Sequence, residues 1–271
     1  MATVTIFDAY ERRTWAGRAA AFAGSFAGLC AYPVPQLLDA AEVREGVGVL
    51  DVGTGTGTVA AAACERGAKV TAVDAEPSMV ELAARAVPSA EVQLAVLPEL
   101  PFGDGTFDAV VGNFVLNHVG SPRDALAELR RVVRPGGRIA LTIWAVPAAS
   151  GQALLGRAVE AAGVVRPPHL PPLAPEDDFP RDPEGLTGLM ASAGLREAAC
   201  ETIRWDHRAT AEEWWSGPAA SVGFIGQIVV SRPSETRAEI KRHFELLCRE
   251  FAGADGRLVL PHAALLARAC R

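Results

Sequence analysis

Apolar residues follow two alternating spacings from residue 46 onward. Short apolar runs typical of buried strands stand at 47–52 (VGVLDV) and 69–74 (KVTAVD). Each run is followed by a segment of helical length, at about 56–66 and 77–86. Strands that alternate with helices form parallel sheets with right-handed crossovers, so this pattern predicts a βαβα unit.

The same alternation continues to residue 144. Three more strands are predicted by the apolar runs at 91–96 (EVQLAV), 107–113 (FDAVVGN) and 138–144 (RIALTIW). Before the last of them we expect a helix with Ser121 as its N-cap and Pro122 at its first position; Asp124 comes close to completing a capping box. The RPGG sequence at 134–137 is expected to end this helix.

The C-terminal part has a less regular pattern. Seven prolines in residues 166–183 predict a loop or lid, and a short helix follows to about residue 194. The run at 196–208 predicts an outer strand, and Thr210 with Glu213 forms a capping box that opens helices reaching about residue 251. The tail is ambiguous between strand and helix; we favour a strand at 257–260 and assign nothing beyond it.

These elements predict an α/β fold, with a Rossmann-like, doubly wound, mostly parallel sheet of seven strands and a helical cap. The expected division of the chain is an N-terminal helical cap at 1–45, a ligand-binding core at 46–148, a Pro-rich lid or linker at 149–182, and the end of the sheet at 183–271 with helices inserted at 210–253.

Composition narrows the class of protein. The 271 residues are 49% hydrophobic and 21% charged, which excludes a disordered or fibrous chain. The net charge is −6 and basic residues are interleaved with acidic ones, so no nucleic-acid surface is indicated. The uncharged stretch 19–38 is broken by Pro33 and Pro35 and fits a membrane span poorly, and the first residues lack a signal-peptide pattern. We therefore expect a cytoplasmic protein.

Cysteines and histidines give no sign of a metal or disulfide framework. The five cysteines are odd in number and form no CxxC pair, and the five histidines lack metal-ligand spacing. We therefore expect reduced cysteines and no metal.

The clearest candidate for chemistry is VLDVGTGTG at 49–57, between a predicted strand and a helix. Gly53, Gly55 and Gly57 allow a tight turn that a ligand can approach closely, with the N–H groups of the next helix behind it. Asp74 ends the next strand, where a carboxylate can accept hydrogen bonds from both hydroxyls of a ribose. The pattern thus predicts a nucleoside site at the carboxyl edge of the sheet.

Two kinds of nucleoside fit this turn. The spacing of Gly55, Gly57 and Ala60 also satisfies the dinucleotide fingerprint in its Ala form, which leaves an NAD(P)-dependent oxidoreductase open. Asp51, however, stands at the strand end beside the turn, where its charge would repel a pyrophosphate and attract an ammonium group. A nucleoside that carries an amino acid therefore fits better.

The chain resembles the class I S-adenosylmethionine (SAM)-dependent methyltransferases, and most closely their ubiquinone/menaquinone-type small-molecule branch. The resemblance covers residues 46–145 and rests on four segments in family order: VLDVGTGTG, VTAVDAEPSMVELA, LPFGDGTFDAVV and LAELRRVVRPGGRIAL. It implies SAM as the cofactor. It also implies that Asp51 and Gly53 hold the methionine end, that Asp74 holds the ribose, and that Met79 and Leu97 hold the adenine.

One position departs from the family pattern. The segment before Leu100-Pro101-Phe102 usually carries an acid that accepts from the adenine amino group, and this chain has Val96 there. The adenine is then held by backbone and apolar contacts, or the cofactor binds less tightly.

The acceptor site is expected at the same edge of the sheet. Asn113 follows the fourth strand on the cofactor side, and Trp144 follows the fifth. Tyr10 and Trp15 of the cap and Trp214 of the inserted helices are further candidates for the wall of this pocket.

Methyl transfer needs mainly positioning and exclusion of water, so few catalytic residues are expected. His118 is the candidate base because it lies just past a strand end; its alternative role is to fix the loop there.

The sequence therefore predicts a SAM-dependent methyltransferase acting on a small, largely apolar acceptor, with a place in secondary metabolism. The acceptor atom (O, N or C) and the oligomeric state stay open. The alternatives are a SAM-binding cyclase or regulator that transfers no methyl group, and the oxidoreductase above.

Overall fold

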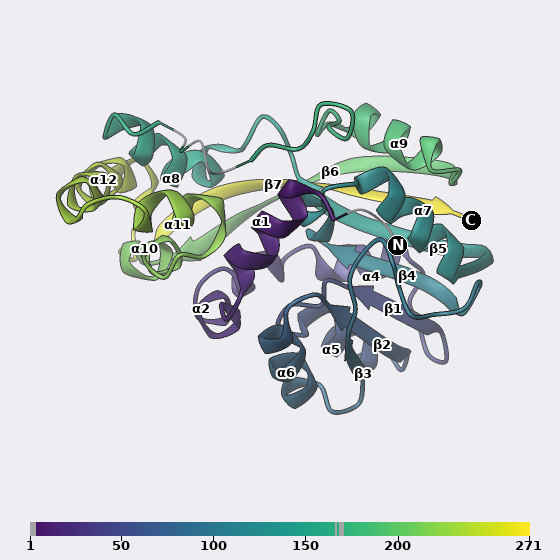
Figure 1. The fold of residues 1–271 in the computed structure, drawn as a ribbon. Helices are drawn as coiled ribbons and strands as arrows, with labels where there is room; N and C mark the ends of the chain where they lie inside the picture. Colours follow the sequence, from purple (N-terminus) through teal and green to yellow (C-terminus); the bar gives the residue numbers. More distant parts are fainter. Residues whose placement is uncertain (1–3, 166, 168–170) are drawn as a thin grey trace.

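The computed structural model describes residues 4–165, 167 and 171–271. Their strands form one seven-stranded sheet in the order β3-β2-β1-β4-β5-β7-β6 (Figure 1). The strands are β1 (Gly48–Val52), β2 (Lys69–Asp74), β3 (Glu91–Leu94), β4 (Phe107–Asn113), β5 (Val133–Trp144), β6 (Arg196–Ala209) and β7 (Leu258–Cys270). Strands β1 to β5 are parallel, and β7 runs antiparallel between β5 and β6. The predicted α/β fold with a mostly parallel, seven-stranded sheet is confirmed.

The order of the strands reverses beside β1. The chain passes from β1 outward to β2 and β3, and then returns to β4 on the other side of β1. In such sheets a crevice opens at the carboxyl ends of the two strands that flank the reversal. Here those ends are Val52 of β1 and Asn113 of β4.

Helices cover both faces of the sheet. One apolar cluster joins Val49 to α4 (Val34–Ala40) and α5 (Thr58–Glu65), while a second joins Leu50 to α7 (Pro122–Val132) and α9 (Pro183–Ser192). Neighbouring residues of a strand face opposite sides, so β1 is buried on both faces. The helix α6 (Pro77–Ala86) packs against β2 and β3.

A third group of helices lies beyond the carboxyl edge of the sheet (Figure 1). The N-terminal helices are α1 (Ile6–Trp15), α2 (Ala19–Ala23) and α3 (Ala27–Cys30). The later ones are α8 (Ser150–Ala161), α10 (Ala211–Ala219), α11 (Gly223–Val230), α12 (Ser234–Leu247) and the short η2 (Cys248–Phe251). An apolar cluster joins α1 to α8, α11 and α12, so the two ends of the chain build this part together.

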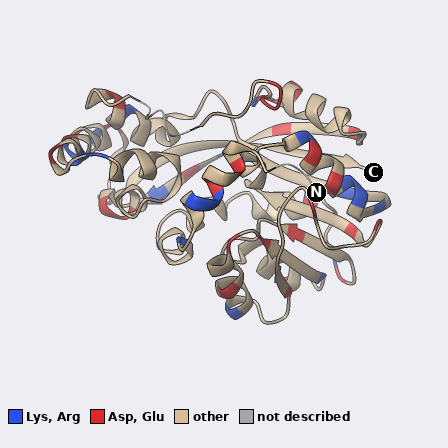
Figure 2. Cartoon of the chain, in the orientation of Figure 1, with Lys and Arg blue, Asp and Glu red and all other residues tan. Residues whose placement is uncertain are grey.

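Charges are mixed along the outer helices. Figure 2 shows basic and acidic residues interspersed on α7 and α12. Several pair three or four positions apart, among them Arg131 with Glu128 and Arg242 with Glu239. No helix in the described ranges is both long and apolar enough to cross a bilayer.

The elements differ from the sequence predictions in four places. Strand β7 has 13 residues instead of the predicted four, because it is buried between β5 and β6 and its apolar run does not alternate. Strand β5 starts at Val133, directly after α7, and so includes the RPGG sequence. The predicted lid at 149–182 contains the packed helix α8. Ser121 is the N-cap of α7, but its side chain makes no capping hydrogen bond.

The capping box of Thr210 and Glu213 is confirmed, and Thr5 with Asp8 forms another at the start of α1. Residues 1–3 of the expected cap and 166 and 168–170 of the expected lid lie outside the described residues.

Candidate functional site

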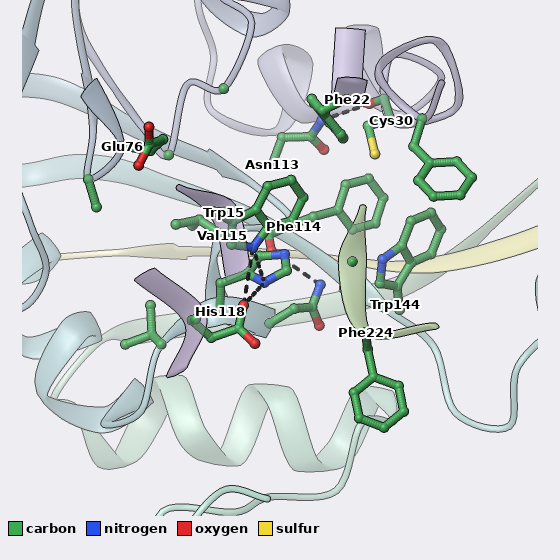
Figure 3. A pocket seen from close by; sticks show the side chains of 18 of the residues that line it. Trp15, Phe22, Cys30, Glu76, Asn113, Phe114, Val115, His118, Trp144 and Phe224 are labelled. Atoms are coloured by element: carbon green, nitrogen blue, oxygen red, sulfur yellow. Dashed lines mark hydrogen bonds and ion pairs between the residues drawn. The ribbon is translucent and has the colours of Figure 1, made fainter. Parts of the chain in front are cut away.

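A cavity of about 880 Å³ opens at the carboxyl edge of the sheet. Its wall comes from α1, the glycine turn after β1, the ends of β2, β4 and β5, the Pro-rich segment near 171–181, and the helices α10 and α11. Figure 3 shows Glu76 at one end, Trp144 and Phe224 at the other, and Trp15 with His118 between them.

The glycine turn needs residues without side chains. Gly53, Gly55 and Gly57 have φ angles of 69°, 55° and 87°, in the left-handed region that favours glycine. A Cβ on Gly53 would lie 2.6 Å from Cγ2 of Val115. The N–H groups of Gly53 and Thr54 donate to the Val73 carbonyl at 2.8 and 3.0 Å, which fixes the turn against β2.

Asp74 faces the turn from the end of β2. Its carboxylate accepts from the N–H of Gly55 at 2.8 Å and of Glu76 at 3.0 Å. Burial raises the pKa of Asp74, and these two N–H donors act against the rise. A carboxylate has about four acceptor sites, so Asp74 keeps capacity for further hydrogen bonds from a ligand in the cavity.

Asp51 lies beneath the turn and is fully buried. Its Oδ2 accepts from the hydroxyl of Thr54 at 2.7 Å, while its Oδ1 has no partner among the described residues. Burial raises its pKa to about 7; the Thr54 bond opposes this and the charge of Asp74 adds to it. A buried acceptor of this kind favours a hydrogen-bond donor at the turn over an anionic pyrophosphate.

The wall beyond Asp74 is apolar. Met79, Ala95, Val96 and Leu97 line it, and no carboxylate stands at position 96. A flat heteroaromatic ring would contact these side chains through its faces and not through a charged partner.

The N-terminal helices close the cavity from above. The N–H of Gly17 donates to Glu76 Oε1 at 3.0 Å, and the Phe22 ring lies 3.7 Å from an ideal Cβ on Gly55. At the other end of α1, Asp8 accepts from the N–H of Gly120 at 2.7 Å. These contacts hold the cap over the glycine turn.

A carboxylate orients the His118 ring. His118 belongs to the short helix η1 (Val115–His118), and its Nδ1 lies 2.8 Å from Glu11 Oε2 on α1. The same oxygen accepts from the indole N–H of Trp15 at 3.1 Å. Since a carboxylate accepts only, Nδ1 donates to it, and in the neutral form of the ring Nε2 then holds the lone pair.

Asn113 ties the sheet to the cap. Its amide N–H donates to the Cys30 carbonyl at 2.7 Å, and its oxygen accepts from the Thr142 hydroxyl at 2.6 Å. Next to it Phe114 stacks on Trp144, with ring centroids 4.1 Å apart. The two rings cover one another's faces, and both belong to the cavity wall.

Most predicted site residues line this one cavity. Those in its wall are Gly53, Gly55, Asp74, Met79, Val96, Leu97 and Asn113 on the cofactor side, with Tyr10, Trp15, His118, Trp144 and Trp214. Asp51 and Gly57 are not in the wall: Asp51 lies beneath the turn, and Gly57 is the N-cap of α5.

Sequence reasoning missed Glu11 and His262, which also line the cavity. Glu11 precedes Trp15 by one helical turn, a spacing that places both on one face of α1. His262 lies in β7, beyond the strand that the sequence predicts at 257–260. His207 lies in β6, and its ring is 5.3 Å from that of Trp214.

Residues 50–141 match the methyltransferase domain family. The demethylmenaquinone methyltransferase of Paenarthrobacter aurescens is 36% identical over 111 residues, 41% of this chain and 44% of that protein. The chain spans about a third to a half of the length of the first curated relatives that it matches.

Solved structures share the fold. The YcgJ protein of Bacillus subtilis is 20% identical with a TM-score of 0.56, over 89% of this chain and 98% of that one. The [4+2]-cyclase SpnF is 18% identical with a TM-score of 0.52, over 89% of this chain and 80% of that one.

Proposed function

The chain carries a class I SAM-dependent methyltransferase domain, and from this premise we propose that it transfers the methyl group of SAM to a small, largely apolar acceptor. The observation that carries the proposal is one cavity that combines two surfaces. At one end stand the glycine turn and Asp74, and at the other stand aromatic side chains. A nucleoside and an apolar molecule can lie there in contact, shielded by the N-terminal helices.

The residues at the turn fit the cofactor. SAM supplies a methyl group on a positively charged sulfur, together with an ammonium group, a ribose and an adenine. Asp74 would accept from the ribose hydroxyls with its remaining lone pairs, and Met79 and Leu97, which line the same cavity, would contact the adenine. Asp51, beneath the turn, would favour the ammonium group through its unpartnered oxygen.

The chain's own contribution to the reaction is positioning and exclusion of water. The stacked rings of Phe114 and Trp144 offer a flat apolar surface to the acceptor. The contacts of Gly17 with Glu76 and of Asp8 with Gly120 keep the cap closed over both ligands.

Two roles fit the Glu11–His118 pair. As a base, His118 receives the acceptor's proton on Nε2, and Glu11 stabilises the imidazolium that forms. As an anchor, the pair joins α1 to η1 and keeps the cap in place. The first role affects turnover, and the second affects cofactor affinity and folding.

A SAM-binding cyclase or regulator is the second candidate. The likeness to SpnF is one of fold alone. SpnF is named as a [4+2]-cyclase, so this fold also occurs in a protein with that name. The oxidoreductase alternative is disfavoured by the buried Asp51 next to the place where a pyrophosphate would lie.

Methyl transfer is tested with SAM labelled in its methyl group. The full chain is incubated with the labelled cofactor and a panel of phenols, alcohols, amines and enols, including precursors typical of secondary metabolism. Mass spectrometry then follows the label. The proposal predicts label in an acceptor in equal amount to the S-adenosylhomocysteine formed. SAM binding without any transferred label across the panel would favour the second candidate.

A further inference from the structure

The end of the cavity distant from the glycine turn is built around His262. Its ring contacts those of three tryptophans, with centroid distances of 6.1 Å to Trp144, 6.0 Å to Trp205 and 5.4 Å to Trp214. The strand register explains this gathering. Trp144 pairs with Ala264 and Trp205 pairs with His262, so these side chains point to one face of the sheet.

The hydrogen bonding of His262 fixes its tautomer. The Nδ1 atom lies 2.8 Å from the Leu260 carbonyl, which can only accept, so Nδ1 carries the proton. The Nε2 atom therefore holds a lone pair, and no donor to it is found in the described part of the chain. His262 is 2% exposed and belongs to the cavity wall.

The surroundings keep this imidazole neutral. Burial lowers the pKa of His262 to about 4; the Leu260 hydrogen bond and Asp206 oppose this fall, and a protonated His207 would add to it. His207 is itself held neutral, since burial and the charge of Arg257 lower its pKa against the effect of Glu213. The ring is thus a hydrogen-bond acceptor at neutral pH.

The same end of the wall lacks charged side chains. The wall residues from β5, α8, α10, α11 and β7 are Trp144, Gln152, Leu155, Trp214, residues 222–225 and His262. The carboxylates and guanidinium groups of the wall belong to α1, the β2 end and the Pro-rich segment, where Asp178 pairs with Arg181 at 2.7 Å. The wall residues from these five elements offer no counter-ion to a charged ligand group.

Two further buried polar atoms in these wall residues lack partners among the described residues: the indole N–H of Trp214 and Oε1 of Gln152. A hydroxyl group can both donate and accept a hydrogen bond. It therefore complements the donor of Trp214 and the two acceptors, Gln152 Oε1 and His262 Nε2. The stacked Phe114 and Trp144 rings match an aromatic or flat apolar body.

We propose that His262 is the specificity-determining residue of a distal subsite, and that this subsite takes an uncharged aromatic acceptor whose hydroxyl donates to His262 Nε2. The inference rests on the proposed function, because the occupant is taken to be the methyl acceptor. His118 lies between this subsite and the glycine turn, so His262 selects and orients the acceptor and takes no proton from it.

Binding of model compounds to the full chain without SAM tests this. The probes are 4-propylphenol, its methyl ether, which cannot donate, and 4-propylbenzylamine, which is cationic. Calorimetry or ligand-observed NMR is expected to show the phenol binding about fivefold to tenfold more tightly than the ether, the effect of one hydrogen bond. Equal binding of phenol and ether, tighter binding of the ammonium compound, or no binding of the phenol would overturn the proposal.

Variants locate the effect. His262→Asn keeps a donor for the Leu260 carbonyl but places no acceptor at the Nε2 position, whereas the longer His262→Gln restores an acceptor there. We expect His262→Asn to lose the preference for the phenol over the ether, and His262→Gln to regain part of it. His243→Asn, on α12 beside Glu239, is the matched control and should keep the full preference. If His262→Asn lost equal amounts of affinity for the phenol and for the ether, the result would contradict the assignment of His262.

The test stays informative if His262→Asn fails to fold, because the wild-type preference and the Gln variant then decide it. SAM affinity, measured on the same samples, separates this inference from the proposed function. A phenol preference without SAM binding would overturn the proposed function and support the subsite. SAM binding without a phenol preference would overturn the subsite and leave the proposed function in place.

Discussion

His118 Nδ1 lies 2.8 Å from Glu11 Oε2, although the two residues are 107 positions apart in the chain. The contact joins the first helix to the exit of β4, at the middle of the cavity. It gives the imidazole a fixed orientation and leaves Nε2 as the only ring nitrogen able to take a proton. Such a pair can serve as a general base, and it also holds the cap.

The effect of His118→Ala depends on the acceptor. With a phenol, ionisation in water is accessible, so we expect kcat to fall less than about a hundredfold; with an alcohol the fall should be ~10²–10⁴. In both cases SAM affinity should stay near the wild-type value. The measurement is kcat against pH for both acceptors, with calorimetry for SAM. Full turnover of His118→Ala at every pH would exclude His118 as the base. Loss of SAM binding or of folding in this variant would identify His118 as an anchor of the cap.

Asp74→Ala is expected to weaken SAM binding by roughly tenfold or more. The change removes hydrogen bonds from the ribose hydroxyls to a charged acceptor, each worth about 1 kcal/mol or more. Calorimetric titration measures it, with Asp104→Ala, on an exposed side chain that pairs with Arg131, as the control. Unchanged SAM affinity in Asp74→Ala would show that the ribose lies elsewhere.

Val96→Asp is expected to tighten SAM binding about fivefold. Val96 lines the apolar wall near Met79, and a carboxylate there can accept from the adenine amino group. S-inosylhomocysteine, which has a carbonyl oxygen in place of the adenine amino group, is the control ligand, and its affinity should not rise as that of S-adenosylhomocysteine does. A loss of affinity for both ligands would mean that the adenine does not reach residue 96.

Asp51 should make the ligand-free protein less stable as the pH rises. Burial raises its pKa to about 7 in the folded state, against about 3.9 in an unfolded chain. The folded state then binds more protons between these values, so this carboxyl lowers the free energy of unfolding as pH rises through that window.

Asp51→Asn removes this titration. Relative to wild type, the variant should gain on the order of 1 kcal/mol or more between pH 5 and pH 8 in urea unfolding. A constant difference between the two proteins across this range would place the Asp51 pKa near its ordinary value.

The sequence predicted the sheet and the glycine turn well because their signals are local. Short apolar runs such as 69–74 identify strands, and the glycines at 53, 55 and 57 mark a turn that only small residues can form. Seven of the nine predicted cofactor residues line the cavity because they end a strand, as Asp74 and Asn113 do, or come soon after one, as Met79 of α6 does.

The end of the cavity around His262 was predicted only in part, because long-range packing creates it. His262 lies on β7, whose apolar run has no period since both neighbours bury it, so neither the strand nor its register could be read from the chain. The Glu11–His118 contact depends on how α1 folds back over the sheet. No local sequence pattern predicts this arrangement.

Calorimetric titration of the full chain with SAM, S-adenosylhomocysteine and NAD tests the central claim most directly. The account predicts that SAM and S-adenosylhomocysteine each bind at one site, with an affinity that falls in Asp74→Ala, and that NAD does not compete. Binding of NAD together with no binding of SAM would contradict it.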